Sequence, residues 1–392
     1  MRTDPSRRSF LLAAAGSTFL LRGNGVEPGI QLIKTPNGGL QPQAVVDTEG
    51  TIHLIYLYGD PAAADIGYVR KAPGERDFSP AIRVNSQPGS AIAIGTVRGA
   101  HIVLGSSGRV HVAWNGSSTA EPKGPRNGAP MLYTRINERR DGFEPQRSVM
   151  TTASGLDGGG SLAADGHGNV YVTWHAQGQE NGKPIEGEEH RRVWIARSTN
   201  DGTTFDPEKP VSPRDRGVCA CCGMGALADD AGHLYVLYRS VRETVHRDMY
   251  LLVSRDAGQT FEAISLHPWQ IGACPTSTVS LVSRHGRVLL AWETNKQVYF
   301  APVDAHTMRV GLPTAPPGEG NNRKHPAIAI DQNGRTILAW TEGTGWKRGG
   351  SLAWQLFDES GQPLALSGIS PGLPAWDFAT TVSTRNGFAI IS

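Results

Sequence analysis

All four cysteines of the chain lie in two short segments that occupy corresponding places in the sequence. Cys219, Cys221 and Cys222 belong to the run Cys-Ala-Cys-Cys, and Cys274 follows in a later segment, directly before a proline. Each segment precedes a short apolar stretch that we expect to form the innermost strand of a repeated unit. Adjacent units would then bring Cys274 close to the other three cysteines, so that four thiols could act together.

Three interpretations of the cysteines are open at this level. An even number of cysteines in an oxidising compartment indicates disulfides, with Cys274 stapling two units together. Clustered thiolates also bind soft metal ions, and copper or zinc would be the expected cofactor. The third interpretation is a reactive thiol, because a bridge between the adjacent Cys221 and Cys222 would be strained. The sequence contains no Cys-x-x-Cys-His, so covalent haem is not supported.

Other polar and aromatic residues occupy or adjoin the beginnings of further inner strands. We expect them to form a ligand-binding face together with the cysteines; they are His101, Lys324, His325, Trp376 and Asp377. Three more histidines lie in connections that open on the same face, namely His175, His190 and His246.

An internal repeat must position all of these residues. A short apolar strand, usually ending in an aromatic residue, follows a glycine-containing turn seven times, at intervals of 48 to 64 residues. A small-residue strand precedes each turn, and a third and usually a fourth strand follow, which is the four-stranded antiparallel meander of a β-propeller blade. The seven repeated strands span 52–56, 110–114, 170–174, 234–238, 288–292, 336–340 and 388–392.

Composition agrees with this all-β prediction. The 392 residues include 48 glycines and 26 prolines, which suits many short strands joined by turns. The formal net charge is +2 and no basic stripe occurs, so nothing indicates a nucleic-acid partner.

The repeat predicts six complete blades between about residue 40 and residue 368. The segments 376–382 and 387–392 then begin a seventh blade, which the N-terminal segment 30–35 would complete, so that both termini close the ring. A six-bladed ring with an irregular closure and a pair of packed β-sandwich domains are the alternatives.

The first 28 residues are typical of a signal peptide. Arg7 and Arg8 precede a short apolar run, and this pairing resembles the twin-arginine export signal. We therefore expect export to the periplasm or beyond, with a single mature domain over residues 29–392. An ordinary signal peptide or a short anchor is the alternative, and no later segment is apolar for long enough to cross a membrane.

Two eight-residue segments, 198–205 and 254–261, carry a more specific motif. Both resemble the Asp-box (BNR repeat) of the sialidase-like β-propeller superfamily, in which an acidic or amide side chain caps a tight turn, a glycine takes positive φ and an aromatic residue packs beneath. The resemblance implies a propeller fold, with these motifs structural and on the face away from the site. The matching residues are Ser198, Asn200, Gly202, Thr204, Phe205, Ser254, Asp256, Gly258, Thr260 and Phe261.

The chain departs from that family at the residues expected to be catalytic. Sialidases of this type use three arginines on the substrate carboxylate, a tyrosine activated by a glutamate, and an aspartate as acid and base. The segment 38–47, which corresponds to the place of the first arginine, contains none. By residue type alone the candidates are Arg239, Arg242, Arg247, Glu293 and Tyr299.

These observations favour an exported sialidase-like propeller that binds or hydrolyses a glycan or a related extracellular ligand in its central funnel. If the protein is an enzyme, the resemblance implies a glycoside hydrolase. A metal-binding or redox propeller that uses the cysteines is the first alternative, and a protein-interaction scaffold is the second.

Overall fold

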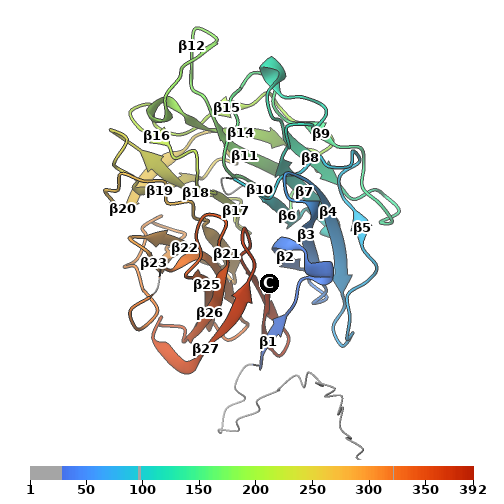
Figure 1. Cartoon of the computed structure of the whole chain (residues 1–392), viewed down its shortest axis with the longest axis vertical. Helices are drawn as coiled ribbons and strands as arrows, with labels where there is room; N and C mark the ends of the chain where they lie inside the picture. The colour runs from blue at the N-terminus through green and yellow to red at the C-terminus, as the bar shows by residue number, and fades with distance from the viewer. Residues whose placement is uncertain (1–28, 96–98, 321) are drawn as a thin grey trace, which may run out of the picture.

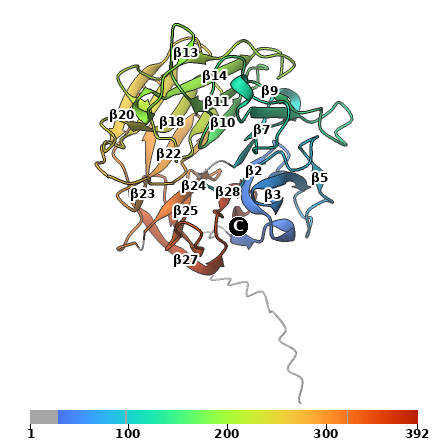
Figure 2. The ribbon, with the colours of Figure 1, turned by 45° about the horizontal axis from the view of Figure 1, so that its top comes forward.

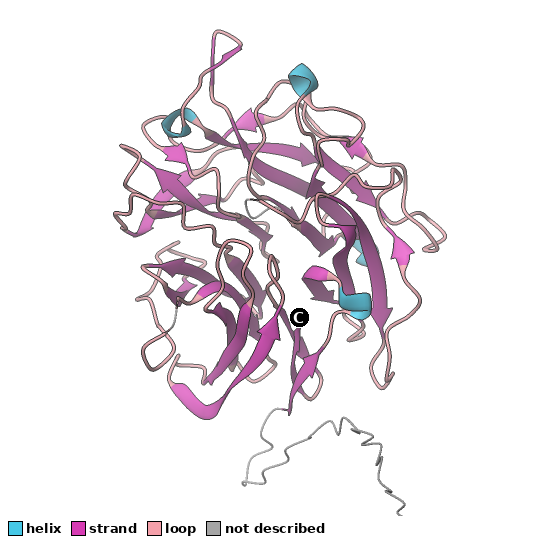
Figure 3. Ribbon diagram, viewed as in Figure 1, coloured by secondary structure: helices cyan, strands magenta, loops and turns pink. Residues whose placement is uncertain are grey.

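The computed structural model describes residues 29–392 except residues 96–98 and 321, and this part of the chain consists of β-strands and the loops that join them, with almost no helix (Figure 3). Its helical segments are four short 3-10 turns. The predicted signal segment, residues 1–28, lies outside the described residues. Among the described residues, no helix has the length and apolarity that crossing a membrane requires.

Seven small antiparallel sheets surround a central channel, as the blades of a propeller (Figures 1 and 2). Blade 1 consists of β2 (Leu40–Val46), β3 (Ile52–Asp60), β4 (Ala63–Lys71) and β5 (Ile82–Arg83). Blade 2 consists of β6 (Ala100–Leu104), β7 (Val110–Asn115), β8 (Met131–Arg135) and β9 (Arg147–Ser148). Blade 3 consists of β10 (Gly160–Ala164), β11 (Val170–Ala176), β14 (Arg192–Ser198) and β15 (Lys209–Pro210).

Blades 4 to 7 complete the ring. They consist of β17 (Gly225–Ala228), β18 (Leu234–Val241), β19 (Met249–Ser254) and β20 (Glu262–His267), with the extra strand β16 (Gly217–Val218); β21 (Ser280–Arg284), β22 (Arg287–Thr294) and β23 (Gln297–Val303); β24 (Lys324–Ile330), β25 (Thr336–Glu342), β26 (Gly350–Phe357) and β27 (Pro363–Leu373); and β28 (Thr380–Thr384), β29 (Gly387–Ile391) and β1 (Gly29–Ile33).

The turn between the first two strands of a blade is fixed by a recurring aspartate. In blade 1, Asp47 Oδ1 accepts hydrogen bonds from the N–H groups of Glu49 and Thr51, and Gly50 takes a φ of 89°. A short acceptor side chain and a glycine that tolerates positive φ stabilise such a turn without distant contacts. The same arrangement recurs in three other blades, at Asp165, Asp229 and Asp331.

The hydrophobic core is divided into seven clusters, one between each pair of neighbouring blades. The aromatic residues that end most of the repeated strands supply much of this packing. Trp114, Trp174 and Trp292 are fully buried, because a strand inside a stack of sheets contacts apolar side chains on both faces.

The ring closes between the two ends of the described chain. β1 pairs with β29 in parallel, with Gly29 opposite Gly387 and Ile33 opposite Ile391, and the C-terminus lies beside β1 in Figure 1. Blade 7 therefore contains strands from both ends, which confirms the predicted seventh blade and its closure. The six-bladed and double-sandwich alternatives are wrong.

The order of antiparallel strands also decides which connections share a face. The beginning of each inner strand and the connection between the second and third strands lie on one face, which we call the upper face. The turns between the first and second strands, and between the third and fourth, lie on the opposite face.

Candidate functional site

The loop that carries the three neighbouring cysteines lies on the upper face, between β16 and β17. Both strands pair with β18, so the two ends of the loop are attached to one strand. Cys219 N–H donates to the carbonyl of Arg239 at 2.9 Å, and Gly223 N–H donates to the carbonyl of Ser277 in blade 5 at 3.0 Å. The loop is therefore held against two blades.

The three thiols of this loop converge. The Sγ atoms of Cys219 and Cys221 are 3.3 Å apart, those of Cys219 and Cys222 are 3.7 Å apart, and all three lie within 4.8 Å of one another. Their residues are only 1 to 4% exposed, and all are free thiols. We call this group the cysteine cluster.

Cys274 does not join the cysteine cluster, contrary to the expectation from the sequence. It is exposed, as are Gly272 and Ala273 before it, and burial of the loop resumes only at Pro275. The loop of blade 5 approaches the cluster through Ser277 instead. Cys274 is itself a free thiol, so the expected staple between two blades does not form.

Arg247 of blade 4 and Glu188 of blade 3 contact the loop of the cysteine cluster and each other. Arg247 Nη1 donates to Cys219 Sγ at 3.2 Å and forms an ion pair of 2.8 Å with Glu188 Oε1. The same carboxylate oxygen accepts the N–H of Ala220 at 2.7 Å. Burial acts against the charge of Arg247, but its bond to Glu188 and the nearby thiols raise its pKa.

A second buried ion pair lies beneath the cluster. Arg239 Nη2 lies 3.5 Å from Glu293 Oε2 and also donates to the Glu293 carbonyl, while the guanidinium covers the ring of Trp269. Burial raises the pKa of Glu293 to about 7, although Arg239 acts in the opposite direction.

The three thiols titrate as a coupled group. Burial opposes the charge on Cys222, yet hydrogen bonds from Cys219 and Cys221, and the charge of Arg239, hold the pKa of Cys222 well below its usual value. Hydrogen bonds to its two neighbours and burial raise the pKa of Cys221. The cluster thus favours at least one thiolate, stabilised by arginines.

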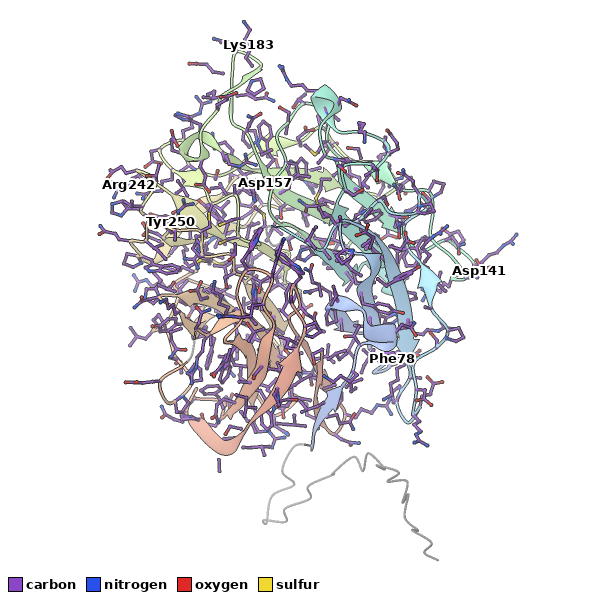
Figure 4. The ribbon with its side chains drawn as sticks, in the orientation of Figure 1. Phe78, Asp141, Asp157, Lys183, Arg242 and Tyr250 are labelled. Atoms are coloured by element: carbon purple, nitrogen blue, oxygen red, sulfur yellow. The ribbon has the colours of Figure 1, made fainter. Side chains whose placement is uncertain are left out.

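The three candidate arginines do not converge on one ligand. Arg239 and Arg247 are buried and engaged as described, whereas the side chain of Arg242 is 48% exposed and pairs with Glu243. In Figure 4, Arg242 lies at the outer rim of the molecule. These three candidates therefore do not form, in the described part of the chain, the arginine triad of the resembled family.

The candidates Glu293 and Tyr299 lie on neighbouring strands but face opposite sides of the blade. Tyr299 is paired with Trp292, and Glu293 with Val298, so successive side chains alternate between the two faces. Tyr299 packs against Trp292 and His267, with ring centroids 6.2 and 4.8 Å apart. A glutamate-activated tyrosine is therefore not formed by this pair.

A second group of predicted residues meets at the mouth of the channel. Lys324, His325, Trp376 and Asp377 line one small cavity of about 50 Å³, which we call the channel-mouth pocket. Trp346, from the connection between β25 and β26, adds an aromatic wall; it is 62% exposed and meets Trp376 edge to face at 4.9 Å.

Polar groups complete the channel-mouth pocket. Gln41 N–H donates to Asp377 Oδ1 at 2.7 Å, and its side-chain amide donates to the carbonyls of Trp376 and Ala93. Burial raises the pKa of Asp377 to about 6. Burial and the charge of Lys324 lower the pKa of His325 to about 3, which keeps this imidazole neutral.

Several residues at the pocket have a left-handed backbone. Gln41, Thr276, His325 and Trp376 have φ values of 53°, 46°, 51° and 68°. Such values are uncommon outside glycine, and for a β-branched residue such as Thr276 they are strained. Strain of this kind concentrates at ligand-binding positions, where it directs side chains toward the ligand.

The central channel lies below the pocket and has a volume of about 370 Å³. All seven inner strands contribute to its wall, and His101 projects from β6 among them. Burial lowers the pKa of His101 to about 4, so it is neutral at physiological pH. His101 thus belongs to the channel rather than to the channel-mouth pocket.

The two motif segments form equivalent turns on the lower face. Gly202 N–H donates to Ser198 Oγ and Gly258 N–H donates to Ser254 Oγ, and the two glycines have φ values of 74° and 80°. Further side-chain bonds inside each turn involve Asn200 with Thr204 and Asp256 with Thr260. Phe205 and Phe261 pack against neighbouring core clusters. The segments lie on the opposite face from both sites, as expected, and their side chains bond within their own turns.

The sequence did not single out Glu188, Gln41 or Trp346, which the fold brings to the two sites. Glu188 lies at the end of a long, charged connection whose hairpin projects from blade 3, with Lys183 at its tip (Figure 4). Trp346 occupies the same type of connection in blade 6. A tryptophan in a polar loop on the predicted ligand-binding face was the signal available for that residue.

Comparison with known proteins supports the fold. No family model matches the chain, and no curated protein matches it by sequence. Three solved structures each have a TM-score of 0.52. A protein of unknown function from Dyadobacter fermentans is 12% identical, and the match covers 88% of this chain and 97% of that one. The six-bladed fucose-binding lectin of Aleuria aurantia is 10% identical over 87% and 96%.

The third is the α-L-arabinanase of Penicillium chrysogenum, solved with arabinobiose, which is 12% identical over 82% of this chain and 94% of that one. Sialidases also match, but the NanB enzyme of Streptococcus pneumoniae has a TM-score of only 0.44 at 12% identity. These likenesses show a β-propeller fold and assign no activity.

Proposed function

We propose that this protein is an exported glycan-binding propeller whose ligand occupies the channel-mouth pocket. The observation that carries the proposal is the pair Trp346 and Trp376, set edge to face at 4.9 Å with Trp346 largely exposed. Exposed indole rings beside polar groups suit a saccharide, which presents both apolar C–H faces and hydroxyl groups.

The polar groups around these rings match the remaining needs of a sugar. His325 lines the pocket, and its buried Nδ1 atom has no hydrogen-bond partner among the described residues, so a small movement of the ring would let a ligand supply one. Lys324 and Arg348 line the same pocket and favour a carboxylate-bearing sugar over a neutral one. The lectin and the arabinanase of similar fold make a glycan ligand plausible for this chain as well.

Binding without hydrolysis is the version that we favour. The channel-mouth pocket contains one carboxylate, Asp377, whereas glycoside hydrolysis ordinarily requires two acting on one bond. Glu293 and Tyr299 face opposite sides of blade 5, and neither lines the channel-mouth pocket.

A glycan array with acidic and neutral saccharides tests the proposal. We expect binding of an acidic saccharide, a loss of about tenfold or more in affinity in Trp346→Ala, and no change in the control Leu312→Ala. Leu312 is 90% exposed and lies outside the pocket, so it controls for the loss of an exposed apolar side chain. Binding that survives Trp346→Ala would refute the site, and turnover of sialosides or arabinosides would refute the version without hydrolysis.

A further inference from the structure

The cysteine cluster has the dimensions of a soft-metal site. Three sulfurs bound at about 2.3 Å to a common ion in a plane are about 4 Å apart. Two of the observed Sγ–Sγ distances, 3.3 and 3.7 Å, are slightly shorter than this value, and all three sulfurs lie within 4.8 Å of one another. Little movement is needed for the three sulfurs to bind one ion.

The backbone holds the three sulfurs in place before any ligand arrives. Hydrogen bonds attach the loop to blade 4 through Arg239, to blade 5 through Ser277 and to the blade 3 connection through Glu188. The loop also packs closely against Gly158 of blade 3, where any side chain would collide with the carbonyl of Ala220. A site fixed from three blades loses little conformational entropy on binding.

Two buried arginines lie next to the cluster and carry positive charge. Arg247 donates directly to Cys219 Sγ, and the backbone carbonyl of Arg239 accepts the N–H of Cys219. Two guanidinium groups that cannot lose their protons offset the negative charge of a group of thiolates. Burial also keeps water from competing for the ion.

We infer that Cys219, Cys221 and Cys222 form a three-coordinate thiolate site for copper(I). Thiolate ligands select soft ions, and structural zinc takes four ligands rather than three. Among the described residues the convergent group has three members only. The nearest carboxylates, Glu188 and Glu293, are engaged by Arg247 and Arg239.

Binding is a ligand exchange without electron transfer. Copper enters as copper(I), forms three Cu–S bonds, and the thiols release the protons that they still carry to solvent. This inference does not depend on glycan binding, since the cluster lies between blades 3 and 5 and shares no residue with the channel-mouth pocket.

The test is an anaerobic titration of the reduced, metal-free full chain with copper(I), in competition with a chromophoric copper(I) chelator. We expect one copper per chain, and X-ray absorption of the loaded protein should find sulfur as the only near neighbours. Cys222→Ser should weaken binding by about 100-fold or more. The matched control Cys274→Ser removes the remaining thiol and should leave copper binding unchanged.

Unchanged copper affinity in Cys222→Ser would overturn the inference, as would tighter competition by zinc(II) than by silver(I), which mimics copper(I). Absence of copper binding by the fully reduced protein under anaerobic conditions would overturn it too. X-ray absorption on the unaltered protein provides a result that does not depend on how a variant folds: nitrogen or oxygen neighbours around copper would refute the site. The glycan array, measured on the same metal-free protein, tests glycan binding without copper, so failure of one proposal can be told from failure of the other.

Discussion

Arg247 and Glu188 form an ion pair of 2.8 Å that joins the second-to-third-strand connections of two neighbouring blades across the cysteine cluster. The acceptor oxygen also binds Ala220 N–H, inside the loop that carries the thiols. A single carboxylate thus links the blade 3 connection, the cysteine loop and blade 4. We expect access to the buried thiols to depend on that link.

Thiol modification should therefore occur in two phases. Cys274 is exposed and should react at once with a disulfide reagent, whereas the three buried thiols should react slowly. Glu188→Gln removes the charge that holds Arg247, and we expect it to accelerate the slow phase roughly tenfold, equivalent to about 1.4 kcal/mol. Glu186→Gln, an exposed change in the same connection, serves as the control. Equal slow phases in the two variants would contradict the role of the ion pair.

Gly158 should tolerate no side chain. Its φ is 38°, and an added Cβ would collide with the carbonyl of Ala220 and with His175. We expect Gly158→Ala to lower the free energy of unfolding by more than about 1 kcal/mol, measured by denaturant titration. In Gly166→Ala, where nothing lies within 4 Å of the added atom, the change should be much smaller. Similar losses in both variants would show that the close approach at Gly158 is unimportant.

Asp377 should give the protein a pH-dependent stability. Burial raises the pKa of this carboxyl from 3.8 to about 6 on folding, so the folded protein holds the proton more tightly. The resulting stabilisation is complete below the unfolded pKa and is lost as pH rises through about 6, to a limit of about 3 kcal/mol.

Asp377→Asn cannot titrate but can still accept the Gln41 hydrogen bond. Relative to this variant, the unaltered protein should lose stability between pH 4 and pH 7, by roughly the amount that the pKa shift implies. The check is denaturant unfolding of both proteins across that range. Parallel stability curves would mean that Asp377 does not titrate as its burial requires.

Ring closure should depend on β1. A truncation that removes residues 29–34 together with everything before them would expose the edge of β29. It would also uncover Ile390 and Ile391, which pack in the same core clusters as Ile30 and Ile33. We expect this truncation to lower the melting temperature and promote aggregation through the exposed edge. A protein that lacks only residues 1–28 keeps the strand and is the control. If the two truncations melt at the same temperature, closure by β1 contributes no stability.

The repeat in the sequence determined the fold. Each repeated strand is rich in apolar residues and follows a glycine-containing turn, which an aspartate also stabilises in four blades. The strands and a seventh blade closed by both termini could therefore be predicted from spacing, whereas the choice between six and seven blades needed the structure. The sequence also predicted that Cys219, Cys221 and Cys222 lie close together, because three residues in a span of four cannot be far apart.

Tertiary structure decided which distant residues complete each site. Cys274 occupies the predicted loop, but the loop turns its thiol to solvent and presents Ser277 to the cluster instead. Glu188 and Trp346 come from long connections whose conformation depends on packing between blades, which local sequence does not specify. The sequence by itself therefore determined the ring of blades and the face on which both candidate sites lie. The folded chain decided which side chains meet at each site, because their directions and the contacts between blades depend on tertiary packing.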